Sequence, residues 1–184
     1  KPVDVTEEQI EAVLEQFRGD IKQVPPMYSA KKIDGKKLYE LARQGVEVER
    51  EAKDIRIDEL KLISFDGTNI TVDVTCTSGT YIRVLALDIG EALGCGGHLS
   101  ALRRTRVGSF DLSSAITIDD LADAPQKAQE LTLSMGDALV SLPAIEIPSD
   151  IGVMIKNGYQ LTVADLKTLD LPDFKVDDAL MLRT

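Results

Sequence analysis

Two short stretches of this chain combine residue types that bind nucleic acids. The first runs Ser78-Gly79-Thr80-Tyr81-Ile82-Arg83, in which a glycine turn precedes an aromatic residue and an arginine two positions apart. The second carries the adjacent arginines Arg103 and Arg104. An aromatic ring can stack on a nucleobase, and a guanidinium can hold a carboxylate or a phosphate through paired hydrogen bonds. Together the stretches indicate a nucleic-acid site built on rigid elements.

The spacing of apolar residues predicts the elements that position these side chains. Thr6 and Gln9 have capping-box spacing, which predicts a helix that stops at Gly19. Apolar and polar residues alternate in 70–76, the pattern of a strand with one buried face, and 66–69 forms a turn from a strand at 55–65. The other predicted elements are an extended segment at 21–24, a helix at 37–44, a charged strand at 46–50, a helix at about 84–93, a strand near Arg106 that ends around Leu112, and a helix at 151–157.

Strands followed by helices, without regular alternation, predict an α+β fold. We expect a mixed, largely antiparallel sheet with flanking helices. On extended backbone, Tyr81 and Arg83 would point to the same side, because side chains two residues apart share a face.

The composition excludes several classes of protein. The chain has 184 residues, and it contains neither the apolar run of about 20 residues that a membrane span requires nor a signal-peptide pattern. Its two cysteines, Cys76 and Cys95, have no metal-ligand spacing, so we interpret them as small buried side chains in a reducing cytoplasm. The single histidine, His98, follows two glycines and is interpreted as a turn residue.

The net charge of −10 at first argues against an RNA partner, but the acidity is mostly C-terminal. Residues 109–184 hold 13 acidic and 5 basic side chains, whereas basic residues outnumber acidic ones 8 to 6 within 28–56 and 4 to 2 within 76–108. Because exposed charges more than about 8 Å apart are largely screened in physiological salt, the local balance decides phosphate binding. Lysines on a solvated surface would give the same counts, so charge alone does not establish an RNA site.

The chain resembles the TruB-type tRNA pseudouridine synthases of bacteria over about its first two thirds. The resemblance rests on the Tyr81 and Arg103 stretches together with Pro25-Pro26-Met27-Tyr28-Ser29-Ala30-Lys31-Lys32 and the segment from Gly35 to Gly45. It implies isomerisation of the T-loop uridine of tRNA to pseudouridine, without metal or cofactor. The partner is then the T-arm stem-loop of tRNA, and the setting is cytoplasmic.

The resemblance also implies roles for individual residues. Tyr81 and Leu102 match active-site residues that enclose the uridine, and Arg83 matches the arginine that pairs with the nucleophilic aspartate. Residues 27–54 match an inserted thumb that closes on RNA. The residues expected to bind RNA are Lys31, Lys32, Lys36, Lys37, Arg43, Arg103 and Arg104. The bland alternatives are a core tyrosine at 81, a core leucine at 102, and a solvated hairpin and helix at 27–54.

The family's nucleophile lies in a Gly-x-Leu-Asp-Pro-x-Ala-x-Gly-like loop, and no such motif occurs here. Asp88, in Leu87-Asp88-Ile89-Gly90, lacks the following Pro and Ala, so we interpret it as an ordinary helical aspartate. We therefore expect a fragment that begins in the middle of the catalytic domain and is inactive without its N-terminal half. Arg83, lacking that aspartate, is expected to be exposed or to have a non-native partner.

We expect two domains. Residues 1–142 would form the C-terminal part of the catalytic domain, and 143–184 a short PUA-like or truncated C-terminal segment. Two other functions remain open: a non-catalytic RNA-binding module, and an acidic protein-interaction domain.

Overall fold

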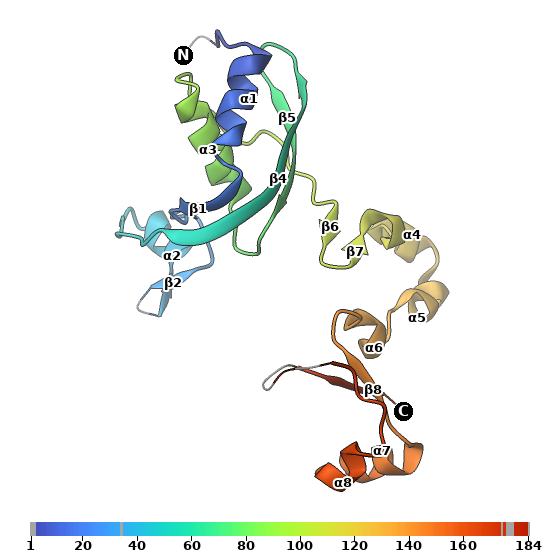
Figure 1. Cartoon of the computed structure of the whole chain (residues 1–184). Helices are drawn as coiled ribbons and strands as arrows, with labels where there is room; N and C mark the ends of the chain where they lie inside the picture. Colours follow the sequence, from blue (N-terminus) through green and yellow to red (C-terminus); the bar gives the residue numbers. More distant parts are fainter. Residues whose placement is uncertain (1–2, 34, 174, 176–178, 184) are drawn as a thin grey trace. The chain divides into compact units, whose positions relative to one another are not determined.

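The chain folds into two compact units, residues 1–102 and 103–184 (Figure 1). The computed structural model describes residues 3–33, 35–173, 175 and 179–183. In this described part, every helix falls short of the length and apolar character needed to cross a lipid bilayer.

Unit 1 contains the α+β arrangement that the periodicity predicts. Its elements are α1 (Glu7–Glu15), β1 (Gly19–Gln23), β2 (Lys32–Ile33), β3 (Lys36–Lys37), α2 (Leu38–Arg43), β4 (Lys53–Phe65), β5 (Ile70–Cys76) and α3 (Ile82–Ala92). The predicted capping box is confirmed, because Thr6 and Gln9 each accept a backbone hydrogen bond from the other at the start of α1. The predicted turn at 66–69 is confirmed as well, with the Asp66 carboxylate accepting from the backbone of Thr68 and Asn69.

The predicted strand at 46–50 is wrong, because these residues adopt no regular structure. The backbone N–H of Val46 instead donates to the carbonyl of Leu41 at 3.0 Å, which ends α2 in a reversal of the chain. Gly45 makes this reversal possible with a φ of +73°. Alternating side chains predict a strand only where a neighbouring strand is available to pair.

The main sheet has the order β1-β4-β5, and both pairings are antiparallel. Its register shifts between Ile57 and Glu59, where β4 contains a bulge. The extra residue allows Ile57 and Leu60 to face the same side, although strict alternation would separate them. Both are buried, with exposed fractions of 0% and 1%.

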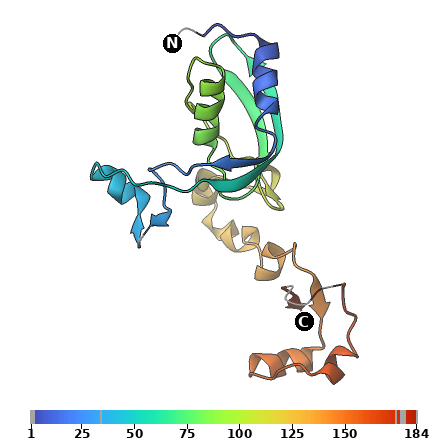
Figure 2. The same ribbon diagram turned by 60° about the vertical axis from the view of Figure 1, so that its left-hand side comes forward.

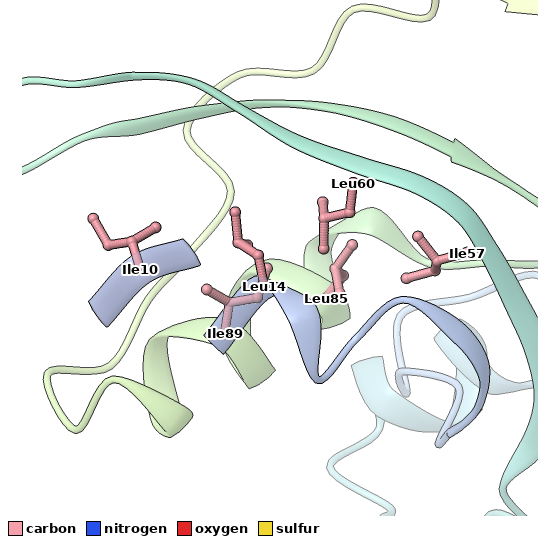
Figure 3. Close-up of a cluster of buried hydrophobic side chains, with 6 residues drawn as sticks. All are labelled: Ile10, Leu14, Ile57, Leu60, Leu85 and Ile89. Carbon is pink, nitrogen blue, oxygen red and sulfur yellow. The ribbon is translucent and has the colours of Figure 1, made fainter. Parts of the chain in front are cut away.

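The core of unit 1 lies between this sheet and two helices. Helices α1 and α3 run side by side over one face of the sheet (Figures 1 and 2). Figure 3 shows the six buried side chains that fill the space between them: Ile10 and Leu14 of α1, Ile57 and Leu60 of β4, and Leu85 and Ile89 of α3. The first turn of α3, where the candidate site begins, is therefore anchored by Leu85.

Unit 2 is made of short elements. They are β6 (Arg106–Val107), β7 (Phe110–Asp111), the 3-10 helix η1 (Leu112–Ser114), α4 (Ile118–Asp123), the 3-10 helix η2 (Pro125–Lys127), α5 (Ala128–Leu131), α6 (Met135–Ala138), β8 (Ala144–Glu146), α7 (Ser149–Lys156), α8 (Val163–Leu166) and β9 (Met181–Arg183). The single strand predicted to end near Leu112 is instead a hairpin of β6 and β7, because Gly108 turns the chain with a φ of +58°. The helix predicted at 151–157 is confirmed as α7. Strands β8 and β9 pair in parallel, unlike the other sheets described.

Candidate catalytic pocket and RNA interface

Tyr81 occupies the N-cap of α3, where the chain enters the helix after β5. Its backbone N–H donates to Oε1 of Gln23 at 2.8 Å, and its carbonyl accepts from Nε2 of Gln23 at 3.2 Å. Gln23 is only 3% exposed. A buried side chain from the end of β1 thus fixes the Tyr81 backbone. No sequence pattern indicates this contact, because 58 residues separate the two positions.

Arg83 lies in the first turn of α3 and not on extended backbone, so the prediction that it shares a strand face with Tyr81 is wrong. The helix begins at Ile82, two residues before the predicted start. The two side chains still meet, because the guanidinium carbon of Arg83 lies 5.6 Å from the centre of the Tyr81 ring. Nη2 of Arg83 also donates to the Tyr28 carbonyl at 2.6 Å. Arg83 is exposed, as expected.

The first turn of α3 is locally positive. It contains no acidic residue, and Arg83 adds a full charge to the partial positive charge of the helix N-terminus. A cation at this end of a helix opposes the helix dipole, at a cost of about 0.3–1 kcal/mol. The Tyr28 carbonyl offers Arg83 a neutral acceptor only. This arrangement suits the approach of an anionic group such as a carboxylate.

A pocket of about 270 Å³ opens beside Tyr81. Its walls combine an aromatic ring, two lysines, one carboxylate and the backbone of a glycine turn. The lining residues are Pro25, Lys31, Lys53, Asp54, Ile55, Ser78, Gly79 and Tyr81. Sequence analysis singled out Lys31 and Tyr81 but missed Lys53 and Asp54, which the β1–β4 pairing brings to this end of the sheet.

A larger hollow of about 600 Å³ lies elsewhere on unit 1, against α1 and the middle of β4. Three glutamates line it, Glu7, Glu8 and Glu11, together with Arg18, Lys61, Leu62 and Ile63. None of the predicted site residues is among them. Its carboxylates would repel phosphate, so its size does not make it the better candidate for an RNA site.

The predicted thumb region contains a small hairpin that gathers lysines. Strands β2 and β3 place Lys32 directly opposite Lys37, and like charges in this position destabilise a strand pair. Two cations lie near the Tyr39 ring of α2: Nζ of Lys37 and the guanidinium carbon of Arg43 are each 5.4 Å from its centre. Concentrating positive charge at some cost in stability is typical of a surface that binds phosphates.

Several cations elsewhere in unit 1 form ion pairs that, among the residues described, the five predicted RNA-binding cations of this region do not, although Arg50 within it pairs with Glu47 at 3.2 Å. Outside it, Arg18, Lys22, Arg56 and Lys61 each lie within 4 Å of a carboxylate. Within the described residues, no ion pair joins a carboxylate to any of the five cations predicted to bind RNA, which are Lys31, Lys32, Lys36, Lys37 and Arg43.

The remaining predicted residues lie at the boundary between the units. Leu102 is the last residue of unit 1 and is 60% exposed, which does not agree with the alternative of a core leucine. It is not among the residues that line the 270 Å³ pocket. Arg103 and Arg104 begin unit 2 and are exposed. Their roles in the site stay predictions.

Asp88 is poorly suited to act as a nucleophile. It is half-buried on α3, and burial, followed by the charge of Glu91, raises the pKa of its carboxyl. Asp88 is also absent from the residues that line the pocket beside Tyr81. His98 is exposed beyond the end of α3. Within the part of the chain that the structure describes, no three His, Cys, Asp or Glu side chains gather in a group able to hold a metal ion.

Two family models match the chain over the residues that form the candidate site. The N-terminal domain model of the TruB family pseudouridylate synthases matches residues 1–82, and the C-terminal domain model of tRNA pseudouridylate synthase B matches residues 83–141. The chain belongs to the TruB family. The junction between the two TruB models falls between Ile82 and Arg83, inside the first turn of α3.

Curated relatives agree with this assignment. The chain is 52% identical over 151 residues to tRNA pseudouridine synthase B of Chromobacterium violaceum. The aligned residues make up 82% of this chain and 49% of that protein. It is 49% identical over 161 residues to the protein of the same name from Azoarcus sp., covering 87% of this chain and 54% of the relative. This TruB chain therefore spans about half the length of these relatives.

Solved structures show the same fold. A crystal structure of a Cbf5-Nop10-Gar1 complex matches with a TM-score of 0.74 at 28% identity, covering 97% of this chain and 52% of that one. A structure of an H/ACA RNP bound to a substrate RNA containing 2'-deoxyuridine matches with a TM-score of 0.71 at 25% identity, covering 97% and 51%. The likeness extends over both units and confirms the α+β fold class.

Proposed function

We propose that this TruB chain supplies the stacking and arginine side of a tRNA pseudouridine synthase active site. The substrate is the T-loop uridine of tRNA, and the reaction is its isomerisation to pseudouridine. One observation carries the proposal: Tyr81 and Arg83 lie together at the start of α3, beside a pocket that Lys31 also lines.

The reaction requires a base to leave its sugar and return through a different atom. The bond between C1′ and N1 breaks, the base turns, and C1′ joins C5. C5 then loses its proton, and N1 gains one. A uridine in a folded loop must first leave its stack, which costs a few kcal/mol. The protein therefore has to offer a replacement for the lost stacking.

Each proposed site residue of this chain has a separate role in the reaction. The Tyr81 ring stacks on the extruded uracil, which is worth about 1–3 kcal/mol per base. Arg83 pairs with the nucleophilic carboxylate and keeps it ionised, since a nearby opposite charge favours the charged form. Leu102, which does not line the pocket beside Tyr81 in the chain alone, contacts the apolar side of the extruded uracil. The phosphates are held by Lys31, Lys32, Lys36, Lys37, Arg43, Arg103 and Arg104.

The nucleophilic aspartate belongs to the part of the relatives that this chain does not cover. The first turn of α3 supports this assignment, because it is locally positive and, among the described residues, its arginine donates to a neutral carbonyl and forms no ion pair. By itself the chain is expected to bind a T-arm but to form no pseudouridine. We further propose that the T-arm is bound in the cytoplasm, that residues 1–142 belong to the catalytic domain, and that 143–184 form a shortened PUA-like segment.

The test is pseudouridine formation on a T-arm stem-loop RNA. The chain is assayed alone and together with the part of the Chromobacterium violaceum relative that the match leaves uncovered; we call this mixture the reconstituted pair. We expect product from the pair and none from either piece, with an RNA carrying cytidine at the target position as the blank. Turnover by the chain alone would contradict the proposal and implicate one of its own carboxylates.

A non-catalytic RNA-binding module is the second candidate. The absence of the family's nucleophile motif from the sequence favours it. The same assay decides between the two, because a binding module would retain the T-arm yet produce no pseudouridine when the second piece is added.

A further inference from the structure

Helix α3 differs from other helices of the chain in how its N-terminus is capped. Helices α1, α4 and α8 each have a capping box, in which an acidic or amide side chain three residues after the N-cap accepts from the N-cap backbone N–H. In α2, Glu40 likewise accepts from the backbone N–H of the N-cap Lys37. In α3 the N-cap is Tyr81, whose side chain makes no capping bond, and the residue three positions on is Val84. Neither residue can provide a local cap.

Gln23 supplies the missing bond from a different element. Its Oε1 accepts from the Tyr81 N–H at 2.8 Å, as Gln9 accepts from Thr6 at 2.9 Å in the capping box of α1. Its Nε2 also donates to the Tyr81 carbonyl at 3.2 Å, so the side-chain amide holds the Tyr81 residue at both ends. An amide buried to this degree is costly unless both its polar atoms are satisfied, and here both are.

A serine, threonine or aspartate at position 81 would accept a hydrogen bond from the backbone N–H of Arg83 or Val84, a capping bond that the Tyr81 side chain does not make. The aromatic residue that the proposed function places against the uracil occupies this position instead. Gln23 takes the role that an acceptor at position 84 would have in a capping box, so the Tyr81 N–H stays paired although Val84 cannot accept from it.

The segment that follows Gln23 makes a second attachment to the same turn. Arg83 donates to the Tyr28 carbonyl at 2.6 Å, and the two prolines between Gln23 and Tyr28 restrict the backbone. Pro25 is fully buried and lines the pocket beside Tyr81. The segment 23–28, which we call the strap, therefore contacts the helix start at Tyr81 and at Arg83.

We propose that Gln23 is a positioning residue of the active site, which sets the Tyr81 ring and the Arg83 guanidinium through the backbone of Tyr81. This inference rests on the proposed function. Gln23 touches neither RNA nor the reacting atoms; it acts through the two residues that do.

The test compares Gln23→Met with Gln9→Met in the reconstituted pair. Both substitutions remove a glutamine that accepts from an N-cap N–H, but Gln9 serves α1, which carries no predicted site residue. We expect Gln23→Met to lower kcat roughly ten- to a hundredfold, the scale of a misplaced reacting group, with the Kd for the T-arm little changed. Gln9→Met should leave kcat close to that of the wild type.

A second measurement uses the 184-residue chain alone and does not depend on activity. The Tyr81 amide is followed by hydrogen exchange with NMR, and Gln23→Met should remove its protection while the amide of Leu85 keeps its own. Gln23→Glu retains the acceptor for the Tyr81 N–H but removes the donor, so it should restore this protection in part.

Three outcomes would each overturn the inference. They are an equal kcat in the two Met variants, a Kd for the T-arm that rises in step with the loss of kcat, and unchanged exchange protection of the Tyr81 amide in Gln23→Met. If the wild-type pair forms no pseudouridine, the proposed function fails. The amide exchange then still decides whether Gln23 fixes Tyr81.

Discussion

Tyr81 and Arg83 each occupy a position at the start of α3 that is unfavourable for their residue type. Tyrosine is not a capping residue, yet it stands at an N-cap, and arginine opposes the helix dipole, yet it stands in a first turn. Their contact over 5.6 Å and the bonds to Gln23 and Tyr28 offset part of this cost. Residues kept in such positions are typical of functional sites.

Removal of the Tyr81 ring tests its stacking role. In the reconstituted pair, Tyr81→Ala should cost about 1–3 kcal/mol of transition-state stabilisation, because the extruded base loses its stacking surface. Steady-state kcat/KM on the T-arm measures this loss. Tyr81→Phe keeps the ring and should remain close to the wild type; equal losses in the two variants would show that the hydroxyl, and not the ring face, matters.

At the residue scale, the sequence indicated which residue types to propose for the site, but not how the side chains are arranged. Tyr81, Arg83 and Lys31 could be singled out because an aromatic residue, an arginine and lysines in these patterns suit RNA. Gln23, Lys53 and Asp54 were missed, because strand pairing brings them to the site and their own sequence neighbourhood carries no signal.

At the scale of elements, the packing of α3 depends on a close approach between two glycines. A Cβ added to Gly90 would lie 2.2 Å from the backbone nitrogen of Gly97, so the turn after α3 is pressed against the helix. The same contact fixes the start of the segment that leads to Leu102. Only glycine permits it.

We therefore expect Gly90→Ala to destabilise unit 1 by about 1–3 kcal/mol or more, since the added methyl meets backbone and not a flexible side chain. Thermal unfolding followed by circular dichroism measures the change. The neighbouring exposed substitution Glu91→Ala is the control and should alter stability by no more than about 0.5 kcal/mol. Equal unfolding temperatures for the two variants would contradict the packing argument.

The β4–β5 hairpin has a pH-sensitive turn. The Asp66 carboxylate accepts hydrogen bonds from the backbone and side chain of Asn69 and from the backbone of Thr68, and these bonds lower its pKa. A carboxyl whose pKa is lower in the folded state stabilises the fold above its unfolded pKa and loses that contribution as the pH falls.

Asp66→Asn should therefore lower the free energy of unfolding at neutral pH. As the pH falls below about 4, the free energies of unfolding of the variant and the wild type should converge. Urea unfolding of both proteins at a series of pH values gives the two curves. Curves that run parallel through this range would show that the turn contributes nothing to the pH dependence.

Elements were predictable where the signal is local. The helix start at Thr6 and Gln9, the turn at 66–69 and the helix at 151–157 each show a short-range pattern, and all three formed as expected. The bulge after Ile57, the missing strand at 46–50 and the early start of α3 were not predictable, because pairing partners and contacts far along the chain decide them.

At the scale of the whole molecule, total charge is a poor guide to the partner. The net charge is −10, and most of this net negative charge comes from residues 109–184, which hold 13 acidic and 5 basic side chains. Arg18, Lys22, Arg56 and Lys61 each form an ion pair with a carboxylate, whereas no such pair is found for Lys32 and Lys36 among the described residues. Local, unpaired charge sets the attraction for RNA.

This difference predicts the salt dependence of T-arm binding. Each phosphate contact contributes about −0.7 to the slope of log K against log salt for a single strand. Replacing both Lys32 and Lys36 with alanine should make the slope shallower by about this amount per lysine. Fluorescence anisotropy over a salt series measures it. Lys61→Ala removes a cation already paired with Glu59, and an equal change there would contradict a localised interface.

The central claim is that this TruB chain contributes Arg83 to an active site whose nucleophile lies on the complementary half. The most direct test is pseudouridine formation by the reconstituted pair with wild-type chain, Arg83→Ala and the control Arg56→Ala, an exposed arginine paired with Asp20 and Asp58. We expect the wild-type and Arg56→Ala pairs to form product, and Arg83→Ala to lose about a hundredfold or more in kcat. Full turnover by the Arg83→Ala pair, or by the chain alone, would contradict the account.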